Sequence, residues 1–217
     1  MAAVPMKPEY GPTLGRLLEP RWRAASRRAR WAVIAASGVA LALAAAIVLM
    51  LLPATYSRGG AVPFGFHYKG LYRAKPDPGA FVKVQSRSGG GALKYVYEVY
   101  PLSLPAYTGG VAGELPRYAS AYVAALAARS SDFELRGEGK TRLNTGEVGY
   151  QVLYTARVEG RKMYGRNVLL LPPREGVRRG VVIAMLTAPG ASAQIKGPIE
   201  VASTGVLQRP LKTFTFE

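Results

Sequence analysis

The chain has 217 residues, of which 49% are hydrophobic and 19% charged, a globular composition that excludes wholesale disorder. It contains no cysteine and one histidine, His67, which excludes disulfides, thiolate metal sites, a cysteine nucleophile and a histidine-rich metal site. The formal net charge of +16 favours an anionic partner, such as lipid headgroups, an acidic polymer or nucleic acid, although an arginine-rich composition that only keeps the protein soluble is an equal alternative.

The N-terminal part of the chain joins a basic tail to a long apolar run. The tail formed by residues 1–30 is short and contains four prolines, so we expect it to be mostly disordered. Between Trp31 and Leu52 the only polar side chain is that of Ser37. A helix of these 22 residues would be about 33 Å long, close to the hydrocarbon thickness of a bilayer. We therefore predict a single transmembrane helix at residues 31–53.

The charges on the two sides of the apolar run are unequal. Residues 16–30 contain six arginines and one glutamate, whereas residues 53–67 contain one arginine. The positive-inside rule then predicts a single-pass protein of the plasma membrane, with a cytoplasmic N-terminus and an extracytoplasmic C-terminal domain. The residues expected to flank the bilayer are Arg21, Arg23, Arg27, Arg28, Arg30 and Trp31.

Two other interpretations of the apolar run were weighed. A cleaved signal peptide has a shorter apolar region and a small-residue cleavage site, and a buried helix of a soluble protein has a polar face, so both fit less well than an uncleaved anchor. Small residues recur every fourth position and suggest dimerisation through the membrane helix, although the run is so rich in alanine that chance explains the pattern as well. These residues are Ala32, Ala36, Ala40 and Ala44.

Residues 54–62 have the composition of a linker, and residues 63–217 form the expected extracytoplasmic domain. Alternation of apolar and polar side chains predicts strands at 64–72, 79–87 and 92–102, with a turn at 88–91. The tyrosines of the third strand are expected to pack in a sheet rather than to form a ligand platform. Helical spacing of Leu115, Tyr118, Tyr122 and Leu126 predicts a helix that ends near Arg129.

The second half of the domain is expected to be rich in hairpins. The pattern predicts strands at 132–144, 149–158, 161–171 and 180–188, with a tight turn at Glu159-Gly160. The strand at 180–188 is wholly apolar and is therefore expected in the centre of the sheet. A helix between Pro198 and Gln208 and a closing strand within 211–217 complete the domain. The predicted fold class is α+β, an antiparallel β-sheet domain packed with two helices.

The C-terminal part of the domain resembles a known superfamily. The residues that carry the resemblance are Gly149-Tyr150, Gly160-Arg161, Gly165 to Pro172, Gly180 to Ile183, and Leu211 to Phe216. In layout and apolar pattern, residues 62–217 are similar to the PsbP-like superfamily of α/β/α sandwiches. The resemblance implies a binding or scaffolding domain of photosystem-associated or bacterial envelope proteins. It carries no common catalytic residues, so none is transferred.

The sequence predicts no motif for catalysis, for a cofactor or for a metal. The segment at 136–142 superficially resembles a phosphate-binding loop, but Glu134 stands where that motif needs a glycine. A Ser-His-Asp triad would have to use His67, which is more simply a residue of a strand. Four carboxylates were considered as an acid–base pair, although no motif supports them. They are Glu98, Glu134, Glu138 and Glu147.

The remaining signal is positive charge. Residues 54–217 contain 22 lysines and arginines against 11 carboxylates. If the strands around the hairpin at 159–160 and the loop after 173 are neighbours, their cations form a basic edge that binds an anionic envelope polymer, an anionic lipid or an acidic protein. A solvated charge run without function is the competing interpretation. The expected binding residues are Arg157, Arg161, Lys162, Arg166, Arg174, Arg178 and Arg179.

The predicted function is that of a non-catalytic, membrane-anchored binding or scaffolding protein of the cell envelope. Nucleic acid is disfavoured as a partner because the domain is expected outside the membrane and carries no motif of a nucleic-acid-binding fold. Two alternatives stay open at this point. One is an accessory subunit of a larger membrane complex, and the other is an envelope hydrolase with an unrecognised carboxylate pair.

Overall fold

The computed structural model describes residues 26–105, 111–174 and 177–217, and the chain divides into two compact units at Leu52 and Pro53. The first unit contains helix α2 (Arg27–Leu51). Ser26 caps this helix, because its Oγ accepts a hydrogen bond from the backbone N–H of Ala29 at 3.3 Å. The helix thus begins four residues before Trp31, so that Arg27, Arg28 and Arg30 lie in its first turn. Arg21 and Arg23 lie outside the described residues.

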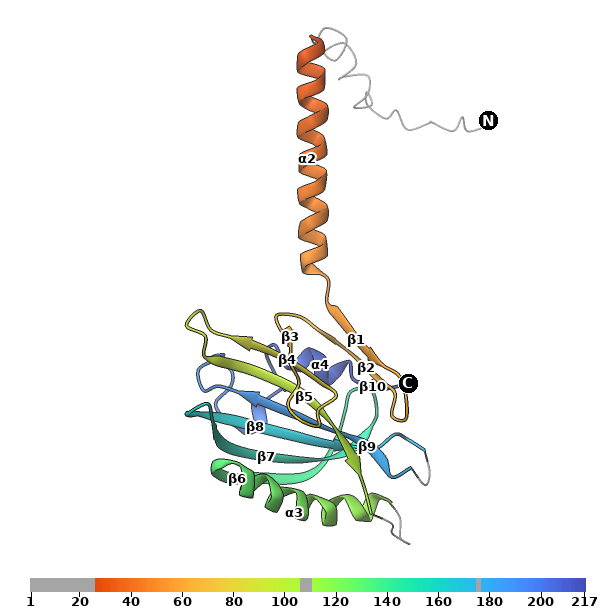
Figure 1. Ribbon diagram of the computed structural model, residues 1–217, viewed down its shortest axis with the longest axis vertical. Helices are drawn as coiled ribbons and strands as arrows, with labels where there is room; N and C mark the ends of the chain where they lie inside the picture. The colour runs from red at the N-terminus through yellow and green to blue at the C-terminus, as the bar shows by residue number, and fades with distance from the viewer. Residues whose placement is uncertain (1–25, 106–110, 175–176) are drawn as a thin grey trace, which may run out of the picture. The chain divides into compact units, whose positions relative to one another are not determined.

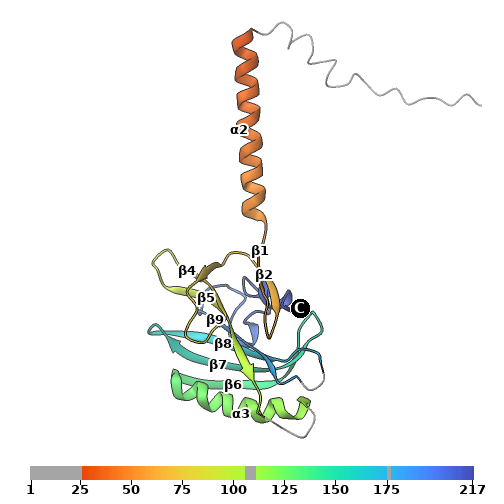
Figure 2. The ribbon, with the colours of Figure 1, turned by 45° about the vertical axis from the view of Figure 1, so that its right-hand side comes forward.

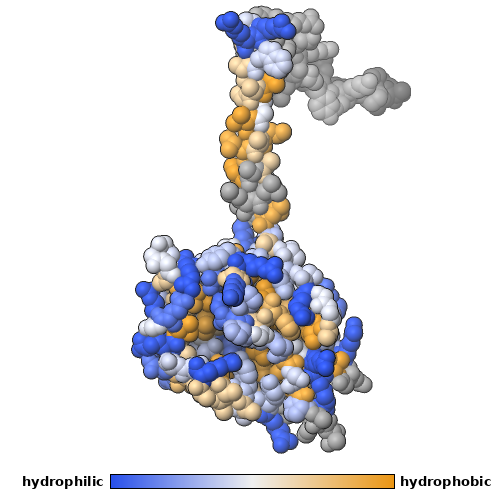
Figure 3. Space-filling model, in the orientation of Figure 1, coloured by the Kyte–Doolittle hydropathy of each residue, from blue (hydrophilic) through white to orange (hydrophobic). Residues whose placement is uncertain are grey.

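Helix α2 has an apolar surface along most of its length. Its 25 residues correspond to about 38 Å. Figure 3 shows apolar residues over its surface and strongly hydrophilic residues at its N-terminal end. Where they are described, its side chains are exposed, including those of Ala32, Ala36, Ala40 and Ala44. By length and composition α2 is able to cross a membrane, a property that it shares with signal sequences near an N-terminus.

The second unit is built on a large antiparallel sheet. In the described residues this sheet has seven strands in the order β3-β4-β5-β9-β8-β7-β6. Strand β9 has three strands on either side, as its apolar sequence predicts, and Ile183 at its middle is fully buried. The strands are β3 (Tyr72–Ala74), β4 (Val82–Arg87), β5 (Leu93–Ser103), β6 (Ser131–Arg142), β7 (Val148–Val158), β8 (Arg161–Leu170) and β9 (Arg179–Thr187).

A second, smaller sheet corrects two of the sequence-based expectations. It consists of β1 (Ala54–Arg58), β2 (Phe64–Tyr68) and β10 (Thr215–Phe216) in the order β1-β2-β10. Residues 54–62 are therefore not a simple linker, because β1 pairs along its whole length with β2. The single strand expected at 64–72 is also wrong. Gly70 has φ +74°, a left-handed conformation that breaks the strand and directs β3 into the large sheet.

The two faces of the large sheet have different covers, as Figures 1 and 2 show. Helix α3 (Val111–Arg129) packs against β6 and β7, and the core on this face includes Leu126, Val152 and Tyr154. The opposite face is covered by the small sheet and the segment that follows β9. Its core includes Tyr97, Ile183 and Phe214. Mixed α+β architecture with antiparallel sheets is thus the observed fold class.

The helix predicted between Pro198 and Gln208 is wrong. That segment begins with the 3-10 helix η1 (Pro198–Glu200), continues through turns, and ends with the short helix α4 (Gln208–Lys212). Continuous helix is prevented because Ala202 and Gly205 both have positive φ, +61° and +74°. The layer opposite α3 therefore has two short helical segments and a three-stranded sheet in place of a second long helix.

Candidate anion-binding site

The basic edge expected from the sequence is divided between the two ends of the sheet. Arg157, Arg161 and Lys162 surround the turn between β7 and β8. Arg178 and Arg179 lie where β9 begins, beside the far end of β8, and Arg174 precedes them in the same loop. Strand β8 separates the two groups by about 30 Å. The expectation that the loop after Pro173 returns to the hairpin is therefore wrong, because it lies at the opposite end of that hairpin.

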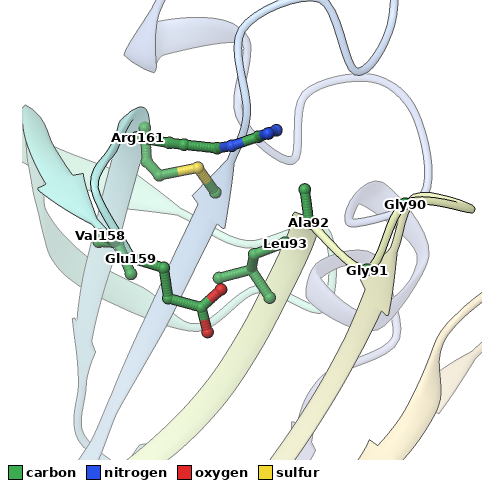
Figure 4. Close-up of a pocket in the computed structure, with 8 residues that line it drawn as sticks. Gly90, Gly91, Ala92, Leu93, Val158, Glu159 and Arg161 are labelled. Atoms are coloured by element: carbon green, nitrogen blue, oxygen red, sulfur yellow. The ribbon is translucent and has the colours of Figure 1, made fainter.

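Two of the cations near the β7–β8 turn, Arg157 and Arg87, have local partners, whereas Arg161 and Lys162 are exposed. The Nε of Arg157 lies 2.7 Å from Asp132 Oδ2, and its Nη1 donates to the carbonyl of Gly160 at 2.9 Å. Glu159 forms a bidentate ion pair with Arg87, with Arg87 Nη2 2.7 Å from Oε1 and Nη1 3.0 Å from Oε2 of Glu159. This pair lowers the pKa of the Glu159 carboxyl. Figure 4 shows the side chains of Glu159 and Arg161 extending from this turn towards the β4–β5 turn, where they line a pocket of about 240 Å³.

At the other end of the sheet, the arginines contact the chain rather than a shared cavity. Arg178 Nη1 donates a hydrogen bond to the carbonyl of Pro105, and the backbone carbonyl of Arg178 accepts one from Leu104 at 2.9 Å. Arg179 pairs with Ser103 in the ladder between β5 and β9, with its side chain exposed. Arg174 is also exposed. None of the pockets found among the described residues is lined by these three arginines together with the hairpin cations.

Arg166 is the exception among the seven, because its side chain points inward. Alternation along β8 places it on the face of the sheet that carries buried Val168 and Leu170. Its Nη1 donates to the carbonyl of Val201 at 3.1 Å and to Ser203 Oγ at 3.3 Å. Its Nε is buried and has no hydrogen-bond partner among the described residues. Burial lowers the pKa of the Arg166 guanidinium, which nevertheless keeps its charge at neutral pH.

Arg166 shares a pocket of about 320 Å³ with two cations that the sequence did not group with it. Arg142 ends β6, Lys212 ends α4, and both side chains are exposed. No carboxylate lines this pocket, and none of the three cations forms an ion pair with a described Asp or Glu. The polar lining residues are Arg142, Asn144, Arg166, Ser203, Gln208 and Lys212.

Hydrogen bonds fix the walls of this pocket. Thr145 Oγ1 in the β6–β7 turn donates to the carbonyl of Phe214 at 2.8 Å, which brings the end of β6 close to α4. Ser203 Oγ donates to the carbonyl of Ile199 at 3.0 Å, and the Gln208 side chain donates to the carbonyl of Ser203. Ala202, the buried residue directly before Ser203, has φ +61°. A residue other than glycine rarely adopts this conformation, so the surrounding contacts must hold it in place.

The carboxylates considered for catalysis lie in separate places. Glu98 is buried and shares Lys83 with Asp77, at Lys83 Nζ distances of 3.2 and 2.7 Å, and accepts a hydrogen bond from Tyr100 at 2.9 Å. Burial alone would lower the pKa of Lys83, but its hydrogen bond to Asp77 and the charge of Glu98 raise it. Asp77 and Glu98 thus share the ammonium group of Lys83 in a network beside strands β4 and β5, which is a structural arrangement and not an acid–base pair.

The other candidate groups show no shared site either. Glu134 pairs with Arg136 at 2.6 Å, Glu147 accepts a hydrogen bond from Thr145, and Glu138 is exposed on β6. His67 lies in β2 with its Nδ1 2.9 Å from Thr55 Oγ1, which is the strand position that the sequence predicts. In the described parts of the chain, no group of three or more His, Cys, Asp or Glu side chains is placed to hold a metal ion.

The sequence contained one overlooked signal for the pocket. Successive residues of β8 on both sides of Arg166 point to opposite faces of the sheet, and both faces are covered. The side chain of a charged residue at position 166 therefore points into one of the two covered faces. That signal points to Arg166 alone. Arg142 and Lys212 reach the pocket through a hairpin and a short helix that are distant in the chain, and no motif links them.

Comparisons with known proteins leave the function open. No family model matches the chain, and no curated protein matches it by sequence. Among solved structures, the chain is similar to a crystal structure of protein PA94 from Pseudomonas aeruginosa, which is described as being of unknown function. The identity is 16%, the match covers 64% of this chain and 84% of the other, and the TM-score is 0.35. A likeness of this size identifies neither a family nor a function.

Proposed function

We propose that the protein is a single-pass, membrane-anchored binding or scaffolding protein of the cell envelope, with its C-terminal domain outside the plasma membrane and without catalytic activity. The observation that carries the proposal is α2, a 25-residue helix with an apolar surface whose first turn contains three arginines. Arginines at one end of an apolar helix stay on the cytoplasmic side of the bilayer during insertion. The carboxyl end of α2 and everything after it then lie outside.

Binding rather than catalysis is supported by the distribution of charge in the domain. Among the described residues, the buried carboxylate of Glu98 forms an ion pair with Lys83 and accepts a hydrogen bond from Tyr100. Three cations without an ion pair to a described carboxylate, in contrast, line one pocket that contains no carboxylate. An acid–base mechanism needs a carboxylate or histidine that is free to exchange a proton with a substrate, whereas anion recognition needs cations without partners.

The resemblance of residues 62–217 to the PsbP-like superfamily remains part of the proposal. The antiparallel sheet with α3 on one face supports it, and the short helical segments on the other face fit it less well. A role as an accessory subunit of a larger membrane complex is the second candidate. It uses the same anchor and would be favoured by co-purification of a stable complex in mild detergent.

Membrane topology is tested with a full-length chain that carries one epitope tag at each end. We expect both tags on one band in the membrane fraction, resistant to carbonate extraction. Protease added to intact spheroplasts is expected to remove the C-terminal tag and to spare the N-terminal tag. Replacing Arg27, Arg28 and Arg30 together with glutamate should raise the fraction of chains with the opposite orientation. Loss of the N-terminal tag from the mature band, or a domain protected until lysis, would overturn the proposal.

A further inference from the structure

The pockets of the domain differ in how much free positive charge they hold. Of the four described here, the one beside the β4–β5 turn contains Glu159, which is bound to Arg87. A second is lined by two carboxylates, Asp132 and Glu134. A third is wide, partly apolar, and has its Arg136 paired with Glu134. This third pocket and the pocket of Arg142, Arg166 and Lys212 each have three cations and no carboxylate in the lining. The cations of the third pocket, Arg136, Lys162 and Lys196, are all exposed. Of these four pockets, the one of Arg142, Arg166 and Lys212 therefore differs in having a cation with a buried nitrogen, the Nε of Arg166, that has no hydrogen-bond partner among the described residues.

The chemistry of this lining selects a class of ligand. Two guanidinium groups, one ammonium group and the side-chain amides of Gln208 and Asn144 offer donors from β6, β8, the β6–β7 turn and the C-terminal segment, and so from several directions. A planar carboxylate is satisfied by one guanidinium fork, whereas a tetrahedral oxyanion uses donors on several sides and carries a second negative charge. The arrangement therefore fits a phosphate group better than a carboxylate.

Arg166 supplies the second, independent reason. A charged group inside a protein is costly unless a counter-charge or hydrogen bonds accompany it. The two neutral acceptors of its Nη1, Val201 and Ser203, provide hydrogen bonds but no negative charge, and its buried Nε has no acceptor in the described part of the chain. An anion in the pocket that Arg166 lines would provide the missing counter-charge.

We propose that the pocket formed by Arg142, Arg166 and Lys212 binds a phosphate group, either as free phosphate or as the headgroup of a phospholipid. This inference rests on the proposed binding function and gives it a site and a ligand class. Arg166 at the base fixes the anion, and the exposed side chains of Arg142 and Lys212 close over it from the β6–β7 hairpin and from α4.

Titration of inorganic phosphate into the full-length chain in phosphatidylcholine nanodiscs tests the site. We expect saturable binding at constant ionic strength, with acetate at least tenfold weaker. The double variant Arg142→Ala/Lys212→Ala removes two exposed charges and is expected to weaken phosphate binding at least tenfold without a change in melting temperature. Arg161→Ala/Lys162→Ala removes the same charge from exposed positions at the β7–β8 turn and should bind as the parent does.

A second experiment distinguishes free phosphate from the headgroup of a phospholipid as the ligand of the pocket. In nanodiscs that contain phosphatidic acid, lost phosphate binding means that the headgroup occupies the pocket, and unchanged binding assigns the pocket to free phosphate. Acetate that binds as tightly as phosphate, or equal losses in the two double variants, would overturn the inference. A chain that binds no phosphate but is still retained on anionic wall polymer at low salt would also overturn it, while leaving the proposed binding function intact.

Discussion

At the scale of single residues, the face of the sheet beneath α3 depends on one glycine. Tyr154 on β7 pairs with Gly165 on β8, and the tyrosine ring lies over the glycine. The ring is fixed in that place, because its hydroxyl donates to Asn167 Oδ1 at 3.3 Å and Asn167 in turn donates to the Tyr122 hydroxyl on α3 at 2.6 Å. Burial raises the pKa of Tyr154, so this hydroxyl stays protonated and remains a donor at neutral pH.

Replacing Gly165 with alanine should therefore destabilise the domain. A Cβ at this position would lie 2.3–2.6 Å from ring carbons of Tyr154, a buried ring that also stacks on Phe133 with 5.4 Å between the ring centroids. Overpacking of this kind costs about 1–3 kcal/mol of the free energy of unfolding, measurable by chemical denaturation. Gly139→Ala on β6 is the matched control, because a Cβ there meets nothing within 4 Å, and it should change stability by less than about 0.5 kcal/mol. Equal stability of both variants would contradict the packing described here.

The ion pair between Lys83 and Glu98 gives a second prediction at this scale. Lys83→Met leaves Glu98 buried beside a methyl group, and we expect a loss of about 2–4 kcal/mol, somewhat less than for a fully enclosed pair because the Lys83 side chain keeps 15% exposure. Because the folded-state pKa of Lys83 is raised, its contribution is complete below about pH 10.5 and declines only as the pH rises through the higher folded value.

The pair is tested by denaturation at several pH values with a compensating double variant. The stability difference between parent and Lys83→Met should be constant from neutral pH to pH 10 and shrink in more alkaline solution. Lys83→Met/Glu98→Gln should recover most of the lost stability, since it removes the isolated charge. A double variant no more stable than the single one would show that Lys83 acts through packing alone.

At the scale of elements, the sequence predicted strands well where burial dominates. The apolar run Val181–Leu186 lies in the central strand β9, and the alternating β5 and β7 place their tyrosines in the two cores as expected. The errors fall where local backbone geometry or a distant partner decides. β1 becomes a strand only because β2 pairs with it, and the segment at 198–208 is broken by residues with positive φ. For the pocket, the alternation of β8 predicts that the side chain of Arg166 points into the domain. The positions of Arg142 and Lys212 in the pocket depend on tertiary contacts that no local sequence pattern encodes.

The central position of β9 has a measurable consequence. Ile183 is fully buried between β5 and β8, so Ile183→Asp places an unpaired carboxylate in the core and should cost several kcal/mol or abolish folding. The cost is measured as the shift of the thermal or chemical unfolding midpoint. Arg179→Asp, at the exposed start of the same strand, should unfold close to the parent. An Ile183→Asp variant with the midpoint of its parent would refute this placement.

At the scale of the whole molecule, the described hydrophobic cores are all built from residues after Leu52. The two larger clusters and the small cluster around Met163 draw their buried members from Val62 onwards. No described buried core residue comes from α2. The domain and the helix therefore have separate sources of stability, one from side-chain packing and the other, under the proposal above, from the bilayer.

A chain of residues 53–217 is accordingly expected to fold without α2. It should remain in the supernatant after ultracentrifugation, melt in one cooperative transition, and match the unfolding midpoint of the domain in the full-length chain. The full-length protein should sediment with membranes. Near-UV circular dichroism reports the tertiary packing of the aromatic core directly. A shortened chain without a cooperative transition would show that the N-terminal unit contributes to the folded state of the domain.

The pairing of β10 with β2 imposes an order of events on biosynthesis. The backbone N–H of Glu217 donates to the carbonyl of Pro63 at 3.1 Å, and Ser57 donates to the Glu217 carboxylate at 3.0 Å, so residues 215–217 close onto strands β1 and β2. A ribosome delivers β1 and β2 early, yet Phe64 and Phe66 acquire their final cover only after residue 216 has emerged. A chain that stops before residue 214 would therefore leave these aromatic side chains without their cover, where chaperones and proteases could reach them.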